Sequence, residues 1–119
     1  MDTAVAAIET SSIAQGTVAA DAMAKTAEVE ILELGPLSPG KFWVLIGGEV
    51  ASVRAAWQRG REVAADALLD SFFIPSLHAG VLPALRGTAP AQDHEALGVI
   101  ETLTAASAIV AADRAAKAA

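Results

Sequence analysis

An internal repeat constrains this 119-residue chain more than any other feature of its sequence. When residues 4–27 are placed on residues 96–119, the two segments align without a gap, and twelve of the 24 aligned positions are identical. Alanine supplies part of that identity, but the blocks Ile-Glu-Thr and Val-Ala-Ala-Asp recur intact. A repeat of this kind indicates that one supersecondary unit is used twice. We therefore expect residues 96–119 to begin a second copy of the domain that residues 4–27 begin.

The apolar pattern predicts the elements of the first copy. Apolar or alternating runs indicate strands, and apolar residues every three to four positions indicate helices. We predict strands at 4–10, 28–34, 41–48 and 69–74, long helices at 13–27 and 49–68, and a short helix at 79–86. The order β-α-β-β-α-β is the ferredoxin-like pattern. We therefore expect an α/β protein of the α+β type, with an antiparallel four-stranded sheet and both long helices on one face.

The second copy is incomplete. We divide the chain into a first domain at 1–86, a linker at 87–95, and a second-domain start at 96–119 that holds only the first strand and first helix. One strand and one helix cannot bury a core of their own. Either the chain is part of a longer tandem protein, which we favour, or another chain supplies the missing elements. In both cases we expect residues 96–119 to be mobile or packed against a neighbouring chain.

Composition excludes several classes of function. The net charge of −6 argues against nucleic acid as a partner, because binding requires neutralisation of phosphates. The absence of cysteine excludes disulfides, thiolate metal sites and cysteine nucleophiles. No apolar run approaches the roughly 18 residues of a membrane span, and an acidic residue stands where a signal peptide needs a basic one. We expect a soluble, cytoplasmic protein with no membrane partner.

The stretch GPLSPGKFW, at residues 35–43, matches the first seven positions of a phosphate-binding P-loop. Such a loop binds phosphate through consecutive backbone N–H groups. Pro36 and Pro39 remove two of these groups, and Phe42 stands where a Ser or Thr would hold magnesium. The segment that follows is strand-like rather than helical. Nucleotide binding is therefore disfavoured, which leaves a rigid β-turn connection or a loop with another function.

Four motifs together carry a resemblance to a known family. These are Ile-Glu-Thr, Ala-Asp-Ala-Met-Ala-Lys, Ser-Pro-Gly-Lys-Phe, and Gly-Gly-Glu-Val before a helix. The sequence resembles the bacterial microcompartment (BMC) shell domain, and most of all the tandem-domain trimeric shell proteins of the propanediol-utilisation type. The resemblance covers the first domain in full and the opening of the second.

This resemblance implies a structural protein and not an enzyme. Three tandem chains of such proteins form a flat pseudohexameric tile with a central pore for small metabolites. The implied partners are further copies of the chain, other microcompartment shell proteins and the encapsulated enzymes. The implied location is the microcompartment shell in the cytoplasm.

In this family the loop between the second and third strands lines the central pore. The resemblance therefore implies a pore loop at Leu37, Ser38, Pro39 and Gly40. Some relatives carry a cysteine at the position of Ser38, and three such cysteines hold an iron–sulfur cluster. A serine is a poor iron ligand, so we expect neither a cluster nor any other metal or cofactor.

The resemblance also implies a contact between tiles. The family's edge lysine aligns with Lys25, and its copy in the second repeat is Lys117. The family often has Pro-Arg-Pro-His after the fourth strand, where this chain has Pro-Ser-Leu-His at residues 75–78. The arginine is absent, which puts an edge contact through that residue in doubt.

The remaining polar residues favour structural roles. Glu9 and Glu101 are predicted to cap the helix that follows each strand rather than to act in catalysis. His78 and His94 have no partners at the spacing of a triad or a metal site. Trp57 lies at helical spacing and is predicted to pack in the core or between subunits. The alternative function is a ferredoxin-like regulatory module that binds a small molecule at a subunit interface, which the fold alone permits.

Overall fold

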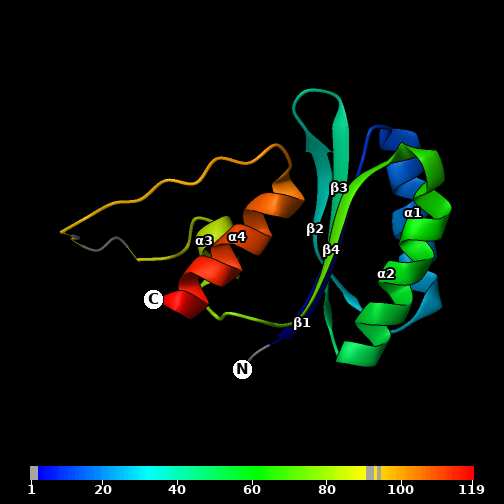
Figure 1. Ribbon diagram of the computed structural model, residues 1–119. Helices are drawn as coiled ribbons and strands as arrows, with labels where there is room; N and C mark the ends of the chain where they lie inside the picture. Colours follow the sequence, from blue (N-terminus) through cyan, green and yellow to red (C-terminus); the bar gives the residue numbers. More distant parts are fainter. Residues whose placement is uncertain (1–2, 91–92, 94) are drawn as a thin grey trace.

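The computed structural model describes residues 3–90, 93 and 95–119. Its first domain contains the predicted elements in the predicted order (Figure 1). In chain order the elements are β1 (Thr3–Thr10), α1 (Ile13–Thr26), β2 (Glu30–Leu37), β3 (Lys41–Gly48), α2 (Val50–Ala64), a 3₁₀ turn (Ala65–Ala67), β4 (Leu68–Leu77), α3 (Val81–Leu85) and α4 (Ala105–Ala118). The predicted α+β class with a four-stranded antiparallel sheet is confirmed.

The sheet has the strand order β2-β3-β1-β4, and every neighbouring pair is antiparallel. The central strand β1 is buried along almost its whole length. Because successive side chains point to opposite faces, Ala6 and Ile8 enter the core on one face while Val5 and Ala7 enter the core on the other. A strand of small and branched apolar residues can therefore serve two cores at once.

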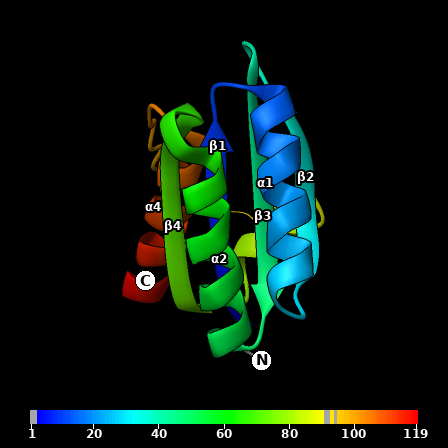
Figure 2. The same cartoon turned by 90° about the vertical axis from the view of Figure 1, so that its right-hand side faces the viewer.

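Helices α1 and α2 cover one face of the sheet side by side, as the sequence predicts (Figure 2). Two glycines permit this close packing. A Cβ atom at Gly60 would lie 2.5 Å from the sulfur of Met23, and one at Gly16 would lie 2.5 Å from the ring of Phe42. The side chain of Ser12 caps α1 by accepting a hydrogen bond from the Gln15 amide at 3.0 Å.

Helix α4 covers the opposite face of the same sheet (Figure 1). It buries Ala106, Ile109 and Asp113 against β1 and β4. The prediction that residues 96–119 would be mobile or packed on a neighbouring chain is therefore wrong for the helix. The reason is that the second face of the sheet is itself apolar, and α4 buries it within the same chain.

The strand predicted at the start of the second copy is absent. Residues 96–102 form no strand, and their large apolar side chains are exposed. The side chain of Leu97, for example, is 86% exposed. A strand needs a neighbour to satisfy its backbone groups, and this segment pairs with no strand within the described residues.

Strand β4 continues past Pro75 to Leu77, whereas the sequence predicts a strand that ends at residue 74. Proline removes a backbone donor and is tolerated at a sheet edge. β4 is an edge strand, so the outward side of its backbone has no partner in the sheet. The pairing with β1 shifts its register between Val5 and Thr3, opposite Pro75, and resumes at Leu77.

Candidate functional site

The loop predicted to line a pore is the tip of the β2–β3 hairpin, which projects beyond the body of the domain (Figures 1 and 2). Leu37 pairs with Lys41 at the last rung of the hairpin. Ser38, Pro39 and Gly40 form the exposed turn, in which Gly40 has a φ of 71° that favours glycine. The structure thus brings the four predicted residues together in one exposed turn.

The hairpin tip carries little reactive chemistry. Its exposed groups are one hydroxyl, a proline ring and backbone amides. Within the described residues, no three His, Asp or Glu side chains are grouped closely enough to hold a metal ion. The tip is therefore suited to defining the shape and polarity of an opening rather than to catalysis.

Lys41, the lysine of the P-loop-like motif, already has a partner. Its Nζ lies 3.0 Å from Oε2 of Glu9, a residue with no exposed surface. The second oxygen of Glu9 accepts a hydrogen bond from the backbone amide of Ala106 at 3.1 Å. Glu9 therefore caps a helix, but the helix is α4 and not α1 as predicted. Ser12 performs the predicted capping function at α1.

A second carboxylate holds the same end of α4. Asp70 Oδ2 accepts hydrogen bonds from the hydroxyls of Thr104 and Ser107, at 2.5 and 3.0 Å, and Oδ1 accepts from the Ser71 amide. Burial alone would raise the pKa of Asp70, but these hydrogen bonds lower it below its ordinary value. Two carboxylates at the start of a helix also interact favourably with its dipole.

A third carboxylate holds the other end of α4. Asp113 Oδ1 accepts from the backbone amide of His78 at 2.8 Å, and Oδ2 pairs with Lys117 Nζ at 2.8 Å. Lys117 Nζ also donates to the carbonyl of Ser76 at 2.6 Å. Burial would raise the pKa of Asp113, but the bonds from Lys117 and His78 lower it below its ordinary value. Residues 76–78 therefore contact α4 through their backbone, without the family's arginine.

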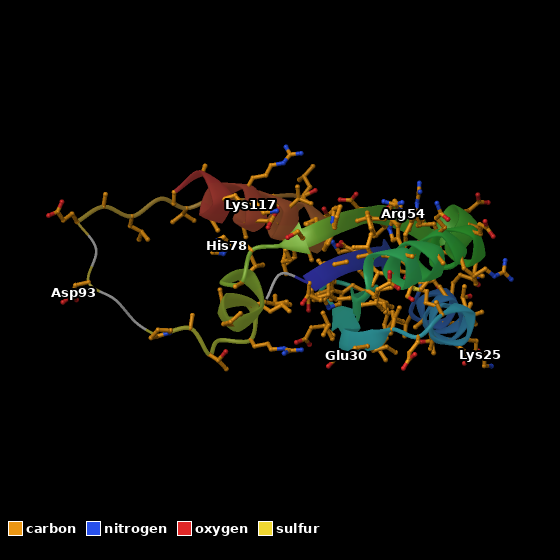
Figure 3. The ribbon with its side chains drawn as sticks, turned by 90° about the horizontal axis from the view of Figure 1, so that it is seen from below. Lys25, Glu30, Arg54, His78, Asp93 and Lys117 are labelled. Carbon is orange, nitrogen blue, oxygen red and sulfur yellow. The ribbon has the colours of Figure 1, made fainter. Side chains whose placement is uncertain are left out.

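The predicted edge lysine lies on a different surface. Lys25 is 75% exposed and pairs with Asp21 at 2.8 Å along α1. Figure 3 shows Lys25 on α1 at one end of the molecule, away from Lys117 on α4. The same Asp–Lys pair thus faces solvent in the first copy and packs against the chain in the second.

Two further predicted residues have structural roles. The Trp57 ring is partly buried, lies 5.7 Å from the Phe73 ring and is covered by the guanidinium of Arg61 at 4.6 Å. His78 Nδ1 accepts a hydrogen bond from the Gly80 amide. His94 lies outside the described residues.

Sequence reasoning missed the carboxylates that hold α4. A signal was present, because Asp113 belongs to the repeated Val-Ala-Ala-Asp block and Thr104 precedes a helix with Ser107 three residues later. What the sequence did not contain was the partner surface, since Asp70 and Glu9 lie far from α4 along the chain.

The depression beside this cluster, lined by Asp70, Ser107 and Arg114 among others, has a volume of about 330 Å³.

The sequence of the first domain matches a known family. Residues 4–77 match the model of the BMC domain, and the chain therefore belongs to the BMC domain family. Among its relatives, the chain is 43% identical over 118 residues to the bacterial microcompartment shell protein PduT of Citrobacter freundii. That alignment covers 99% of this chain and 64% of PduT.

Two further relatives agree with this assignment. The chain is 35% identical over 88 residues to the probable carboxysome shell protein CsoS1E of Prochlorococcus marinus (strain MIT 9313), over 71% of this chain and 43% of that protein. A crystal structure of a microcompartments protein from Desulfitobacterium hafniense DCB superposes with a TM-score of 0.86 at 45% identity. This superposition covers all of this chain and 66% of that one. The chain thus spans about two thirds of the length of PduT and of the Desulfitobacterium protein.

The relatives confirm the predicted BMC family and the likeness to PduT, whereas the tandem-domain trimeric type stays a prediction. The two curated relatives carry the names of shell proteins rather than enzymes, which agrees with the prediction of a non-enzymatic protein. In the part of the chain that the structure describes, no helix is long and apolar enough to span a membrane.

Proposed function

We propose that this chain is a structural subunit of a bacterial microcompartment shell, located in the cytoplasm. The observation that carries the proposal is the family match together with 43% identity to a shell protein along 99% of the chain. The β2–β3 hairpin projects beyond the body of the domain (Figure 1). The subunit has a structural role in the shell and catalyses no reaction.

The hairpin tip is proposed to line the central pore of a tile. Leu37, Ser38, Pro39 and Gly40 lie at the exposed end of a rigid two-stranded arm, and Phe42 and Trp43 anchor that arm in the two cores. Tips from several copies around one axis would present a ring of hydroxyl and backbone groups to small metabolites. No cofactor is proposed, because Ser38 supplies no thiolate for an iron–sulfur cluster.

The tile is proposed to form from copies of this chain in a tandem-domain, pseudohexameric arrangement. The repeat of residues 4–27 at residues 96–119 supports this arrangement. Lys25, exposed at the end of α1, is proposed to contact neighbouring tiles. Other shell proteins and the enclosed enzymes are the further partners.

Electron microscopy tests the proposal. The protein is co-produced with the other shell proteins of its host, and the assemblies are imaged after negative staining. Flat tiles or closed shells that contain the chain support a shell function, and Lys25→Ala should reduce the extent of sheets without dissolving single tiles. A chain that stays monomeric and absent from every shell, yet binds a metabolite tightly by calorimetry, would favour the regulatory alternative.

A further inference from the structure

The ion pairs of the chain single out one edge of the sheet. The sequence contains eight lysines and arginines. Within the described residues, five of them pair with a carboxylate: Lys25, Lys41, Arg59, Arg86 and Lys117. The others are Arg54, Arg61 and Arg114, and all three are exposed. In a chain of net charge −6, three cations without a carboxylate partner in the described structure form an unusual set.

Two of these arginines stack on aromatic rings. Arg54 and Arg61 lie two turns apart on α2, which is about 10.5 Å along the helix axis. The guanidinium of Arg61 lies 4.6 Å from the centroid of the Trp57 ring. The guanidinium of Arg54 lies 5.0 Å from the centroid of the Phe73 ring, and the two rings are 5.7 Å apart. We call these four residues the arginine–aromatic ladder.

Stacking prepares the ladder to bind carboxylates. A guanidinium that already lies on a ring loses less freedom when it binds a further partner. Its N–H groups lie in the plane of the guanidinium, and such a group binds a carboxylate through two parallel hydrogen bonds. Arg54 and Arg61 therefore offer two positioned donors for carboxylates, with aromatic surface between them.

The third arginine borders the same edge from the other face of the sheet. Figure 2 shows β4 at the edge of the sheet, next to α2 and α4. A depression of about 610 Å³ follows this edge, and we call it the β4 groove. Its lining includes Trp57, Phe73, Ile74, Pro75, Val110 and Arg114. Lys117 also lines the groove, and Figure 3 shows Lys117 and Arg54 along the same side of the molecule.

The carboxylates beside the groove are already bonded within the chain. Asp113 is 5% exposed and accepts from the His78 amide and from Lys117. Asp70 accepts from the hydroxyls of Thr104 and Ser107. Neither carboxylate forms an ion pair with an arginine in the described part of the chain. The groove therefore has an excess of positive charge.

The backbone of β4 is a poor template for another strand. Pro75 has no N–H group to donate. The amide of Ser71 already donates to Oδ1 of Asp70 at 2.8 Å. Two backbone donors of this edge strand are thus unavailable to a partner. The groove is suited to a partner held by its side chains rather than by continuous strand pairing.

We infer that the β4 groove binds an acidic segment of another protein, in which carboxylates alternate with apolar side chains. The carboxylates pair with Arg54, Arg61 and Arg114, and the apolar side chains contact the Trp57 and Phe73 rings. The inference goes beyond the proposed shell function, because the groove contains no residue of the hairpin tip and does not include Lys25.

The spacing of the arginines favours a polypeptide over a small anion. One carboxylate or phosphate cannot bridge two guanidinium groups that are two helical turns apart. An extended polypeptide advances about 3.3 Å per residue, so three to four residues span that separation. Nucleic acid fits less well, because the net charge of −6 repels a continuous polyanion.

The experiment titrates the full chain into a fluorescent synthetic peptide with blocked ends and follows its anisotropy. The peptide has about ten residues, the length of a long strand, in which glutamate alternates with valine. It should bind. The same peptide with glutamine in place of glutamate should bind at least about tenfold more weakly. The peptide with lysine at those positions should not bind.

Variants of the chain locate the binding site. The double variant Arg54→Gln, Arg61→Gln should weaken binding of the glutamate peptide by about tenfold or more, and Arg114→Gln by about threefold. Glutamine keeps a good helix former at these exposed positions, so the fold should be retained. The matched control is Arg59→Gln, Arg86→Gln, which removes the same charge from residues paired with Glu62 and Glu33. It should bind like the wild type.

Four results would overturn the inference. Absence of binding by the glutamate peptide is the first, and equal losses in the two double variants, which would indicate overall charge, are the second. The third is displacement of the peptide by inorganic phosphate or by an oligothymidylate at the same concentration of charge. The fourth is self-association of the wild type, seen by analytical ultracentrifugation and lost in the Arg54→Gln, Arg61→Gln variant, which would identify a second copy as the occupant.

Discussion

Glu9 Oε1 accepts a hydrogen bond from the backbone amide of Ala106, 3.1 Å away and 97 residues later in the chain. The carboxylate belongs to the first copy of the repeat and the amide belongs to the second. Its other oxygen pairs with Lys41, at the last rung before the turn of the hairpin. A single buried side chain thus connects the β2–β3 hairpin with the helix on the far face of the sheet.

This connection predicts a matched pair of mutations. Glu9→Ala should lower the free energy of unfolding by about 2 kcal/mol, because it leaves a buried amide and the Lys41 ammonium without their acceptor. Glu9→Gln keeps an acceptor and should cost less. Urea unfolding and hydrogen exchange of residues 105–118 measure both effects.

Glu101 provides the control for this prediction. It occupies the aligned position in the second copy but lies exposed in the segment that leads to α4. Glu101→Ala should change stability by less than about 0.5 kcal/mol. Equal costs at the two positions would contradict the role assigned to Glu9.

The docking of α4 should weaken in acid. The pKa values of Asp70 and Asp113 are lowered below the ordinary value of 3.8 in the folded chain. A group with a lowered folded pKa stabilises the fold above its unfolded pKa, and that contribution is lost as the pH falls through the folded pKa. Exchange of the α4 amides, corrected for intrinsic rates, should therefore speed up as the pH falls below about 3.8.

Asp113→Asn tests the origin of this pH dependence. The amide can still accept from His78 but carries no charge for Lys117, so α4 should be less protected at neutral pH and less sensitive to acid. Asp21→Asn is the control, because Asp21 forms the same kind of pair with Lys25 but is 61% exposed. An acid response that is identical in all three proteins would show that other carboxylates control it.

The sequence was sufficient for the first domain because each of its elements carries a local signal. The apolar run of β1, the alternation in β2 and the apolar stripes of α1 and α2 depend only on neighbouring residues. The position of α4 did not follow in the same way. Its sequence copies α1, so the pattern predicted the start of a second domain, mobile or packed against a neighbouring chain. The pattern did not contain the partner surface that β1 and β4 form within the same chain.

Two residue differences between the copies bear on why α4 packs differently from α1. Thr17 in α1 becomes Ile109 in α4, and Gly16 becomes Ala108. The first change adds an apolar side chain on the face that α4 buries. The second change replaces a glycine with alanine at an exposed position of α4, where no close neighbour requires the absence of a side chain. The exposed residues 96–102 also show that a strand-like sequence does not by itself produce strand pairing.

The hairpin tip makes a prediction about assembly. The chain has no cysteine, so Ser38→Cys introduces a single thiol at the proposed pore. In assembled tiles, mild oxidation should join copies through Cys at position 38, and anaerobic reconstitution should allow iron uptake that the wild type lacks. Non-reducing gels and iron analysis measure these outcomes.

Thr88→Cys is the control for the hairpin prediction, because Thr88 is exposed but lies after α3, away from the hairpin. It should crosslink little and bind no iron. If the two variants crosslink equally in tiles, the hairpin tips do not converge on one axis.

Gly16→Ala should destabilise the fold although alanine favours helices over glycine by about 1 kcal/mol. The added methyl would lie 2.5 Å from the Phe42 ring and 2.6 Å from Thr10 Oγ1, and both residues are buried. Forcing them apart should cost about 1–3 kcal/mol by urea unfolding.

The repeat supplies the counterpart at Ala108, which is exposed on α4. Ala108→Gly should cost only the helix propensity, about 1 kcal/mol, and should leave the rest of the domain unaffected. A stabilising Gly16→Ala would mean that α1 can move away from β3, and the tight helix–sheet contact at this position would then be wrong.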